Sequence, residues 1–316
     1  MLWCFMCKLQ KQKNIKVISY SYEKNKQMTE DKTTENMLME LIAEECTIDA
    51  SETIEYPPTA LSFGYSTIQT KNGEIKYPIS LGSLGNISVV TAPPKSKKSF
   101  YCSLLASVYL SNGNNFGGKL RGHREGRQLL HIDTEQGHWH AARSFNRVRQ
   151  MSVFKDKDSY KTFALRTVGY KERLQFIEYV LEQNKGKNGL VILDGIADLV
   201  ADANDLLSSN ECVAKLMQLS TIYNCHILCV IHQNFGSSKM TGHLGSFLEK
   251  KAELVTSLEL NTTNKDLVTV KCIRSRGYPF ETFSFTINEF GLPCIFADIY
   301  DPLEYFVPRT LTKSTL

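Results

Sequence analysis

The first residues that could do chemistry lie in the string APPKSKKS, which runs from Ala92 to Ser99. A loop of the pattern G-x-x-x-x-G-K-[ST] wraps phosphate groups in backbone N–H groups, brings a lysine to the β/γ oxygens and a hydroxyl to Mg²⁺. Lys98 and Ser99 occupy the last two positions, whereas Ala92 and Lys97 replace the two glycines. Taken alone, the string also fits a basic turn between a strand and a helix. Its position directly after an apolar strand favours a phosphate-binding loop.

Asp194 is the second such residue, because it ends the apolar run LVILD. A carboxylate at the carboxyl end of a central strand can hold the water shell of Mg²⁺. We therefore expect Asp194 and the hydroxyl of Ser99 to form a metal site. An aspartate that caps a turn before Gly195 is the alternative interpretation.

Two further polar runs end apolar segments, DTEQ at 133–136 and HQN at 232–234. Strand ends on one edge of an open α/β sheet converge on the crevice where ligands bind. A carboxylate there can orient and deprotonate a water molecule, and we assign that role to Glu135. A helix cap formed by Asp133 or Thr134 is compatible with it. Residues 232–234 can contact the γ-phosphate or its water, although they equally fit the start of a loop.

The four segments together predict a nucleotide site with ATP and Mg²⁺ as cofactors. Lys98 and Glu135 are the expected catalytic residues of this edge, and Ser99 and Asp194 the expected metal ligands. The expected contacts to the nucleotide are Ala92, Pro93, Pro94, Lys95, Ser96, Lys97, Lys98, Ser99, Phe100 and Gln233.

The elements that must position these residues alternate between strands and helices. Apolar runs predict strands at 86–92, 127–135, 161–168, 189–195 and 225–233, and helical periodicity follows at 98–110, up to Gln150, at 171–184 and at 206–222. Such alternation indicates an α/β fold with a central parallel sheet flanked by helices. After residue 250, strand patterns with short connections at 254–260, 267–276 and 281–287 predict a C-terminal antiparallel extension.

Residues 1–55 differ from the rest in pattern. We expect a flexible or partly helical segment there, with one short amphipathic helix at 35–45, and a single α/β domain over 56–316. Residues 1–27 hold six lysines and one glutamate, whereas 28–55 hold nine acidic residues and one lysine. A basic tail and body suit phosphate-rich partners. Met28 is an alternative start of the chain.

No apolar run approaches the roughly 20 residues that span a bilayer. The sequence therefore predicts a cytoplasmic protein without a membrane partner.

The stretch from Asn86 to Phe285 resembles the RecA-like P-loop ATPases. It is similar to the hexameric replicative-helicase branch (RepA-like and DnaB-like), to the RadA and KaiC group, and to ATPases of phages and mobile elements. The matching strings are APPKSKKS, HIDTEQ, LVILDGIADL, LCVIHQN, GHLGS and CIRSRGYPF. The resemblance implies a RecA-like P-loop domain over 56–316. The missing glycines depart from it, and they bear on the rate of hydrolysis more than on the fold.

The resemblance also implies how such a chain would work. In that superfamily the nucleotide lies between subunits, and a basic hairpin residue of the next subunit reaches the phosphates. Arg274 and Arg276 match those positions and are expected to be catalytic. Two adjacent guanidinium groups need an anion, and no acidic residue follows them before Glu281. The loops at about 201–209 and 235–246 match those that face DNA in a central channel.

The sequence thus predicts a homo-oligomer, a hexamer on single-stranded DNA, that hydrolyses ATP at subunit interfaces in a helicase-like role in replication or remodelling. A recombination mediator or regulator that does not unwind DNA is one alternative. A degenerate P-loop protein that serves as a nucleotide-gated assembly module is another.

Overall fold

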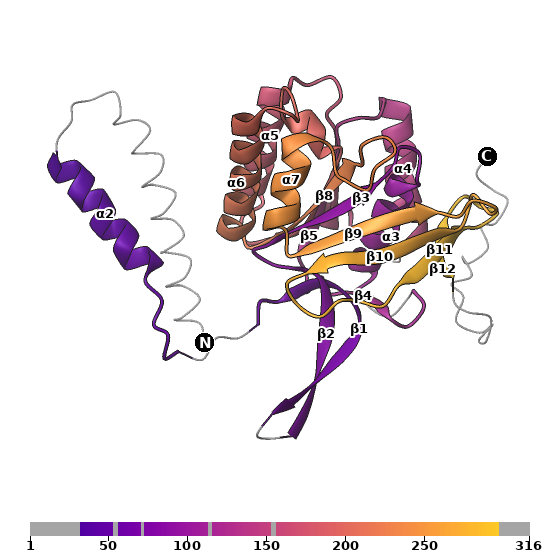
Figure 1. Ribbon diagram of the computed structural model, residues 1–316, viewed down its shortest axis with the longest axis horizontal. Coiled ribbons are helices and arrows are strands. Elements are labelled where there is room, and N and C mark those ends of the chain that lie inside the picture. Colours follow the sequence, from indigo (N-terminus) through magenta and orange to yellow (C-terminus); the bar gives the residue numbers. More distant parts are fainter. Residues whose placement is uncertain (1–31, 53–55, 71–72, 113–115, 153–155, 297–316) are drawn as a thin grey trace. The chain divides into compact units, whose positions relative to one another are not determined.

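The computed structural model describes residues 32–52, 56–70, 73–112, 116–152 and 156–296, in two compact units that divide between Tyr56 and Pro57 (Figure 1). In the N-terminal unit, helix α2 (Lys32–Cys46) confirms the helix predicted at 35–45. Its exposed side chains include Met37, Met39 and Leu41. Met28, the alternative start, lies outside the described residues.

The second unit is built on a nine-stranded sheet, in the order β12-β11-β10-β9-β3-β8-β7-β5-β6. The strands from β9 to β6 in that order are parallel, and β9 to β12 pair antiparallel with one another. The bounds are β3 (Ile87–Ala92), β5 (Gln128–Asp133), β6 (Tyr160–Ala164), β7 (Asn188–Asp194), β8 (His226–His232), β9 (Leu254–Leu260), β10 (Val268–Ser275), β11 (Phe283–Ile287) and β12 (Pro293–Phe296).

The predicted α/β architecture is confirmed, but the position predicted for β9 in the sheet is wrong. We expected it in the antiparallel extension, yet β9 lies parallel to β3. The chain reaches β9 from β8 through helix α7 (Gly242–Lys251), and a crossover through a helix returns the strand in the parallel direction. The antiparallel extension therefore begins at β10.

Helices cover both faces of the sheet, as predicted (Figure 1). On one face, α3 (Lys98–Ser111) and α4 (His138–Met151) pack into one apolar cluster; on the other, α5 (Tyr170–Gln183), α6 (Leu206–Ile222) and α7 pack into a second. Strands β3, β5 and β7 are buried along their whole length between these layers. In the part of the chain that the structure describes, no helix is long and apolar enough to cross a membrane.

A second sheet, of β1 (Thr59–Thr70), β2 (Gly73–Ser83) and β4 (Leu120–Gly122), escapes sequence prediction. β1 and β2 form a long hairpin that projects from the unit (Figure 1). Most residues of β2 are exposed or half-buried and only its last three are buried, so no apolar alternation marks it. At the base of the hairpin, Phe63 stacks on Phe283 with ring centroids 4.3 Å apart, which anchors it to the main core.

The register of the parallel strands decides which residues meet at their carboxyl ends. Ala92 at the end of β3 pairs with His232 at the end of β8. Asp133 at the end of β5 pairs with Asp194 at the end of β7. The loops that follow these four strands therefore start at one edge of the sheet, where ligands bind in open α/β folds.

Candidate active site

The loop between β3 and α3 bends through two residues with left-handed backbone. Lys95 and Lys97 both have a φ of 63°, which side chains other than those of Asn and Asp rarely adopt. Lys97 is the N-cap of α3, and within the described residues no side chain caps that helix. Its first N–H groups are therefore available to an anion. Ala92 ends β3 as a buried strand residue, so of the two positions where the phosphate-loop pattern has glycine, only Lys97 has a left-handed backbone.

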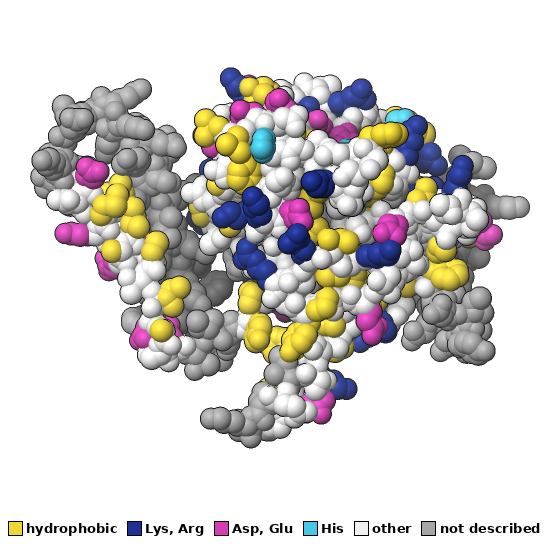
Figure 2. Space-filling model, viewed as in Figure 1, with side chains coloured by type: hydrophobic (Ala, Val, Ile, Leu, Met, Phe, Trp, Pro, Cys, Tyr) yellow, Lys and Arg dark blue, Asp and Glu magenta, His cyan; other side chains and the backbone are white. Residues whose placement is uncertain are grey.

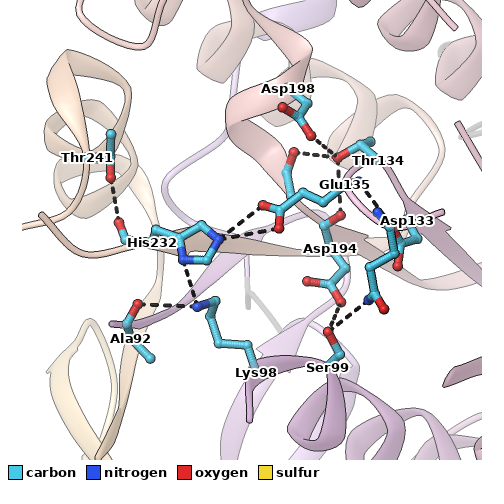
Figure 3. A network of polar contacts seen from close by, with 12 residues as sticks. Ala92, Lys98, Ser99, Asp133, Thr134, Glu135, Asp194, Asp198, His232 and Thr241 are labelled. Carbon is cyan, nitrogen blue, oxygen red and sulfur yellow. Dashed lines mark hydrogen bonds and ion pairs between the residues drawn. The ribbon is translucent and has the colours of Figure 1, made fainter. Parts of the chain in front are cut away.

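The buried Lys98 points across this loop to the neighbouring strand end. Its Nζ donates to the carbonyl oxygens of Ala92 at 3.4 Å and Pro93 at 3.0 Å, and lies 2.9 Å from Nδ1 of His232 (Figure 3). Burial lowers the pKa of Lys98, and the charges of Glu135 and Asp194 oppose that shift. The ammonium group thus lies between the loop and two carboxylates, where a phosphate-binding lysine is needed.

Ser99 and Asp194 meet as predicted. The Ser99 Oγ donates to Asp194 Oδ2 at 2.7 Å, and Gln136 Nε2 donates to the same hydroxyl at 3.2 Å (Figure 3). Burial raises the pKa of Asp194 to about 6, although the hydrogen bond from Ser99 acts against this. A cation beside this carboxylate would favour its charged form.

The donor set fits Mg²⁺ in part. One hydroxyl and one carboxylate are hard oxygen ligands, and Mg²⁺ in phosphate sites takes its other ligands from water and phosphate. No three His, Cys, Asp or Glu side chains gather into a metal site anywhere in the described ranges. The residues present therefore suit a metal ion that arrives with a phosphate ligand rather than one held by protein alone.

Asp133 and Thr134 form the turn that presents Glu135. Asp133 Oδ1 accepts hydrogen bonds from the backbone N–H groups of Glu135 at 3.0 Å and Gln136 at 2.7 Å. The alternative that Asp133 or Thr134 caps the next helix is wrong, because Gly137 is the N-cap of α4. Three residues, 134–136, separate the end of β5 at Asp133 from the helix cap at Gly137. Glu135 is the middle one and lies at the carboxyl edge of the sheet.

Glu135 reaches from this turn to the ring of His232 (Figure 3). Both carboxylate oxygens lie 3.3 Å from Nε2. This hydrogen bond is the main cause that lowers the pKa of Glu135; burial opposes it, and the charges of His232 and Lys98 add to the lowering. The carboxylate is therefore ionised at neutral pH, as a base must be, and 40% of its side chain is open to water.

His232 lies in the run 232–234 that the sequence predicts to contact the γ-phosphate or its water, but the sequence favours Gln233 as the contact. The His232 ring bridges Lys98 and Glu135, whereas Gln233, chosen from the sequence, contacts the loop through its backbone, donating to the Ala92 carbonyl at 3.0 Å. Successive side chains of a strand point to opposite sides, and His232 is the residue paired with Ala92. Its place as the last residue of an apolar strand is the signal that could have identified it.

Arg274 and Arg276 are not brought to this site. β10 ends beside Leu254, where β9 begins, and the phosphate loop lies at the opposite end of β9. The expectation that no acidic residue adjoins them is wrong, because Arg274 Nε lies 2.7 Å from a carboxylate oxygen of Glu249 on α7. Arg276 donates to the carbonyl of Lys251 at 2.9 Å. The partner of Arg274 is distant in sequence, so only the fold reveals it.

The two loops expected to face DNA follow the same sheet edge and are shorter than expected. Their last residues belong to helices, since α6 begins at Leu206 and α7 at Gly242. Phe235 is fully exposed. The N–H and the hydroxyl of Thr241 donate to the His232 carbonyl at 3.0 and 2.9 Å, which ties the second loop to the site (Figure 3).

A hollow of about 430 Å³ lies between α4 and the turn that joins β11 to β12. Exposed Trp139 and Phe290 line it together with Arg143 and Arg147. The Arg147 guanidinium lies 3.8 Å from the ring centre of Phe100, the residue after Ser99. Aromatic surfaces are thus available one side chain away from the loop.

Comparison with known proteins agrees with this geometry. Residues 63–237 match the family model described as AAA domain. No curated protein matches the chain. The flagellar accessory protein FlaH from Methanocaldococcus jannaschii has a similar solved structure, with 14% identity and a TM-score of 0.50 over 68% of this chain and 91% of that chain.

Two other solved structures are similar at lower TM-scores. One, described as an ATPase domain, has 14% identity and a TM-score of 0.49, over 67% of this chain and 85% of that one. The RadB recombinase has 15% identity and a TM-score of 0.46, over 66% and 90%. At such identities a likeness concerns the fold alone.

The matched residues run from β1 to just past β8 and include the loop, Glu135 and Asp194. They make up more than half of the 316 residues. The chain belongs to the AAA domain family, and its α/β fold is similar to that of FlaH.

Proposed function

We propose that this chain binds ATP with Mg²⁺ at the carboxyl edge of the sheet and hydrolyses it. The observation that supports this most is one hydrogen-bonded network in which Lys98, Ser99, Asp194 and Glu135 meet from three strand ends. The N–H groups at the start of α3 and the Lys98 ammonium would hold the phosphates. To reach the phosphates, the Lys98 ammonium has to break its hydrogen bonds to the Ala92 and Pro93 carbonyl oxygens, which bind it more weakly than an anion does.

The remaining roles follow from position. Ser99 and Asp194 would hold Mg²⁺, which when bound neutralises charge on the phosphate oxygens. Glu135 orients a water molecule and takes its proton, and His232 keeps the carboxylate ionised. The base of the nucleotide would lie in the hollow beside Phe100, stacked on Trp139.

Calorimetry with a non-hydrolysable ATP analogue and Mg²⁺ tests binding, and phosphate release tests turnover. Lys98→Ala removes the buried charge, so we expect loss of binding. Glu135→Gln should keep binding and lower turnover by about 10²–10⁴-fold. The matched controls are Lys215→Ala and Glu178→Gln, an ion pair between α6 and α5. Unchanged affinity in Lys98→Ala, or normal turnover in Glu135→Gln, would contradict the proposal.

We infer further that the ATPase works as an oligomer, a hexamer, on single-stranded DNA in a helicase-like role. Single-stranded DNA binds exposed aromatic rings, on which its bases stack, and cationic side chains, which pair with its phosphates. Phe235 and Lys239 supply this pair on a loop tied to His232. Lys and Arg side chains also gather on the face that Figure 2 shows. Lys250 and Lys251 lie in the last turn of α7, and the exposed Arg276 follows β10.

Four measurements separate the possibilities. Phosphate release should rise when single-stranded DNA is added, and Lys239→Ala should weaken DNA binding and reduce its salt dependence. Strand displacement distinguishes a helicase from a recombination mediator that binds DNA without unwinding it. The mass of the protein with ATP and an oligonucleotide gives the ring size. An unaltered salt slope in Lys239→Ala argues against a DNA-facing loop.

A nucleotide-gated assembly module is the second candidate. It is favoured by one observation, a lysine with left-handed backbone where the phosphate loop needs glycine. Nucleotide binding with assembly but without phosphate release, with or without DNA, would support this function over an ATP-driven motor.

A further inference from the structure

The turn that presents Glu135 is held by Asp198, a residue of the LVILDGIADL string that has been given no role so far. Asp198 lies in the short 3₁₀ helix η2 (Ile196–Leu199), which follows β7. Its Oδ2 lies 3.0 Å from the hydroxyl oxygen of Thr134, the residue before Glu135 (Figure 3). The same buried hydroxyl lies 2.7 Å from the carbonyl oxygen of Gly195. The turn after β5 is therefore fastened to the segment after β7.

Asp198 is itself fixed from the opposite side by Arg173 of α5. Arg173 Nη1 donates to the Asp198 carbonyl at 2.8 Å and lies 3.7 Å from its carboxylate. Arg173 Nε donates to the Val168 carbonyl at 2.9 Å, and only 11% of the side chain is exposed. The Arg173 guanidinium is largely buried and is held by several hydrogen bonds, so it restricts the movement of Asp198.

Gly195, which follows β7, contacts the same turn through its backbone. Its φ is 105°, and a Cβ added there would lie 2.6 Å from Cγ of Glu135 and closer still to the Thr134 hydroxyl. The Glu135 side chain thus packs directly on the backbone of Gly195. The direction of that side chain depends on the spacing between the two turns, which Thr134 and Asp198 set.

We propose that Thr134 and Asp198 are positioning residues for the Glu135 carboxylate. The Thr134 hydroxyl shares its one hydrogen between the Gly195 carbonyl and the Asp198 carboxylate, which both lie within hydrogen-bond distance. It thereby keeps Glu135 where it reaches both the His232 ring and the site of an attacking water molecule. The Asp133 side chain holds the N–H groups of the same turn, whereas its backbone pairs with Asp194 on β7. This inference rests on the proposed hydrolysis of ATP.

Thr134→Val tests the proposal, because it removes the hydroxyl and keeps the shape. A misplacement of about 1 Å can lower a rate by about 100-fold, so we expect kcat to fall by roughly 10–100-fold. KM and the affinity for a non-hydrolysable analogue should stay within about twofold, since Glu135 is not a binding residue. Thr134→Ser restores the hydroxyl and should restore kcat. Asp198→Ala, at a partly exposed position, should repeat the loss if Thr134→Val folds poorly.

Thr91→Val is the matched control, because the Thr91 hydroxyl is buried on β3 and has no hydrogen-bond partner among the described residues. Its kcat should equal that of the wild type. The decisive readout is the double variant Thr134→Val, Glu135→Gln. If Thr134 acts through Glu135, it should turn over no more slowly than Glu135→Gln alone.

The outcomes distinguish a failure of the positioning role from a failure of the proposed ATP hydrolysis. Losses that multiply in the double variant, or a Thr134→Val enzyme with normal kcat beside an impaired Glu135→Gln, overturn the positioning role alone. A Thr134→Val enzyme that loses affinity and melting temperature together with kcat also overturns it, in favour of a structural role. A wild-type protein that binds the analogue but releases no phosphate overturns the proposed function, and this inference with it.

Discussion

At the scale of single residues, Lys97 is the point where sequence and local structure conflict. A left-handed backbone costs a non-glycine residue roughly 1–2 kcal/mol. The Lys97 ammonium lies 3.3 Å from Asp266 and 5.3 Å from the ring centre of Phe100. An ion pair whose side chains are 26% and 59% exposed contributes about 1 kcal/mol at most. The side chain therefore offsets only part of the strain.

We predict that Lys97→Gly is more stable to urea than Lys97→Ala by about 1 kcal/mol. Both variants lose the same side-chain contacts, and only glycine adopts a positive φ without strain. Equal midpoints and slopes for the two variants would mean that the loop is not held in the left-handed region.

Gly195 gives a second prediction at this scale. Gly195→Ala places a methyl group against Glu135 and forces alanine into a positive φ. We expect kcat to fall by about 100-fold or more while analogue binding persists. Because Gly186 also has a positive φ of 80° but an open Cβ position, Gly186→Ala is the control for backbone strain alone. Similar kcat values for the two variants would remove the steric argument.

At the scale of elements, sequence patterns identify what is buried on both faces. β3, β5, β7 and β8 are short apolar runs because helices cover both sides of them, and the polar last residues of β5, β7 and β8 therefore stand out. β4 and β12 have only three and four residues. The helix α7 starts with glycine and contains another, which weakens its helical pattern.

The same reasoning explains which site residues could be found. Lys98, Ser99, Glu135 and Asp194 follow from position at strand ends, so the sequence suffices to bring them together. Asp198 and the pairing of Arg274 depend on contacts between segments distant in sequence, and no local pattern encodes those.

Two buried histidines on the central strands predict the response of these elements to acid. Burial lowers the pKa of His131 to about 3, helped by the charge of Arg147, and burial lowers the pKa of His226 although Glu253 opposes it. Both values fall below the ordinary value of about 6.5, so the unfolded chain binds protons first. Their contribution to stability is therefore full above pH 6.5 and is lost as the pH falls below it.

We expect the free energy of unfolding to drop by about 1.4 kcal/mol per pH unit for each histidine below pH 6.5. Urea denaturation at pH 7.5, 6 and 5 measures the slope. His131→Gln cannot titrate but can still bond to the Tyr160 hydroxyl, which lies 3.0 Å from His131 Nδ1. For this variant, the free energy of unfolding should fall less steeply with decreasing pH, by the contribution of one histidine. A slope identical to that of the wild type would exclude His131 as a cause of the acid sensitivity.

At the scale of the whole molecule, the place of the two arginines bears on assembly. Arg274 and Arg276 lie at the edge of the sheet opposite their own phosphate loop, so they do not reach the site of their own chain. Glu249 already holds Arg274. The exposed Arg276, bonded to a backbone carbonyl, is the freer of the two to reach a γ-phosphate.

We predict that a mixture of Arg276→Ala and Lys98→Ala proteins regains activity that neither shows alone. The first keeps its loop and the second keeps its arginine, so a mixed interface contains one complete site. An arginine supplied in trans contributes about 10³–10⁵-fold in rate. Turnover per subunit should also rise with protein concentration. Full activity of Arg276→Ala by itself, or turnover independent of concentration, would contradict a trans-acting arginine.

The projecting hairpin divides the second unit into parts with different solvent exchange. Beyond Tyr65 and Pro78, the described backbone of β1 and β2 pairs strand to strand without a third strand beside it. A two-stranded ribbon is only marginally stable in water. Its amide hydrogens should therefore exchange with deuterium through openings that leave the large sheet closed, whereas those of β3 and β7 should exchange only on global unfolding. We therefore expect the hairpin to open as a separate cooperative unit while the rest of the fold stays intact.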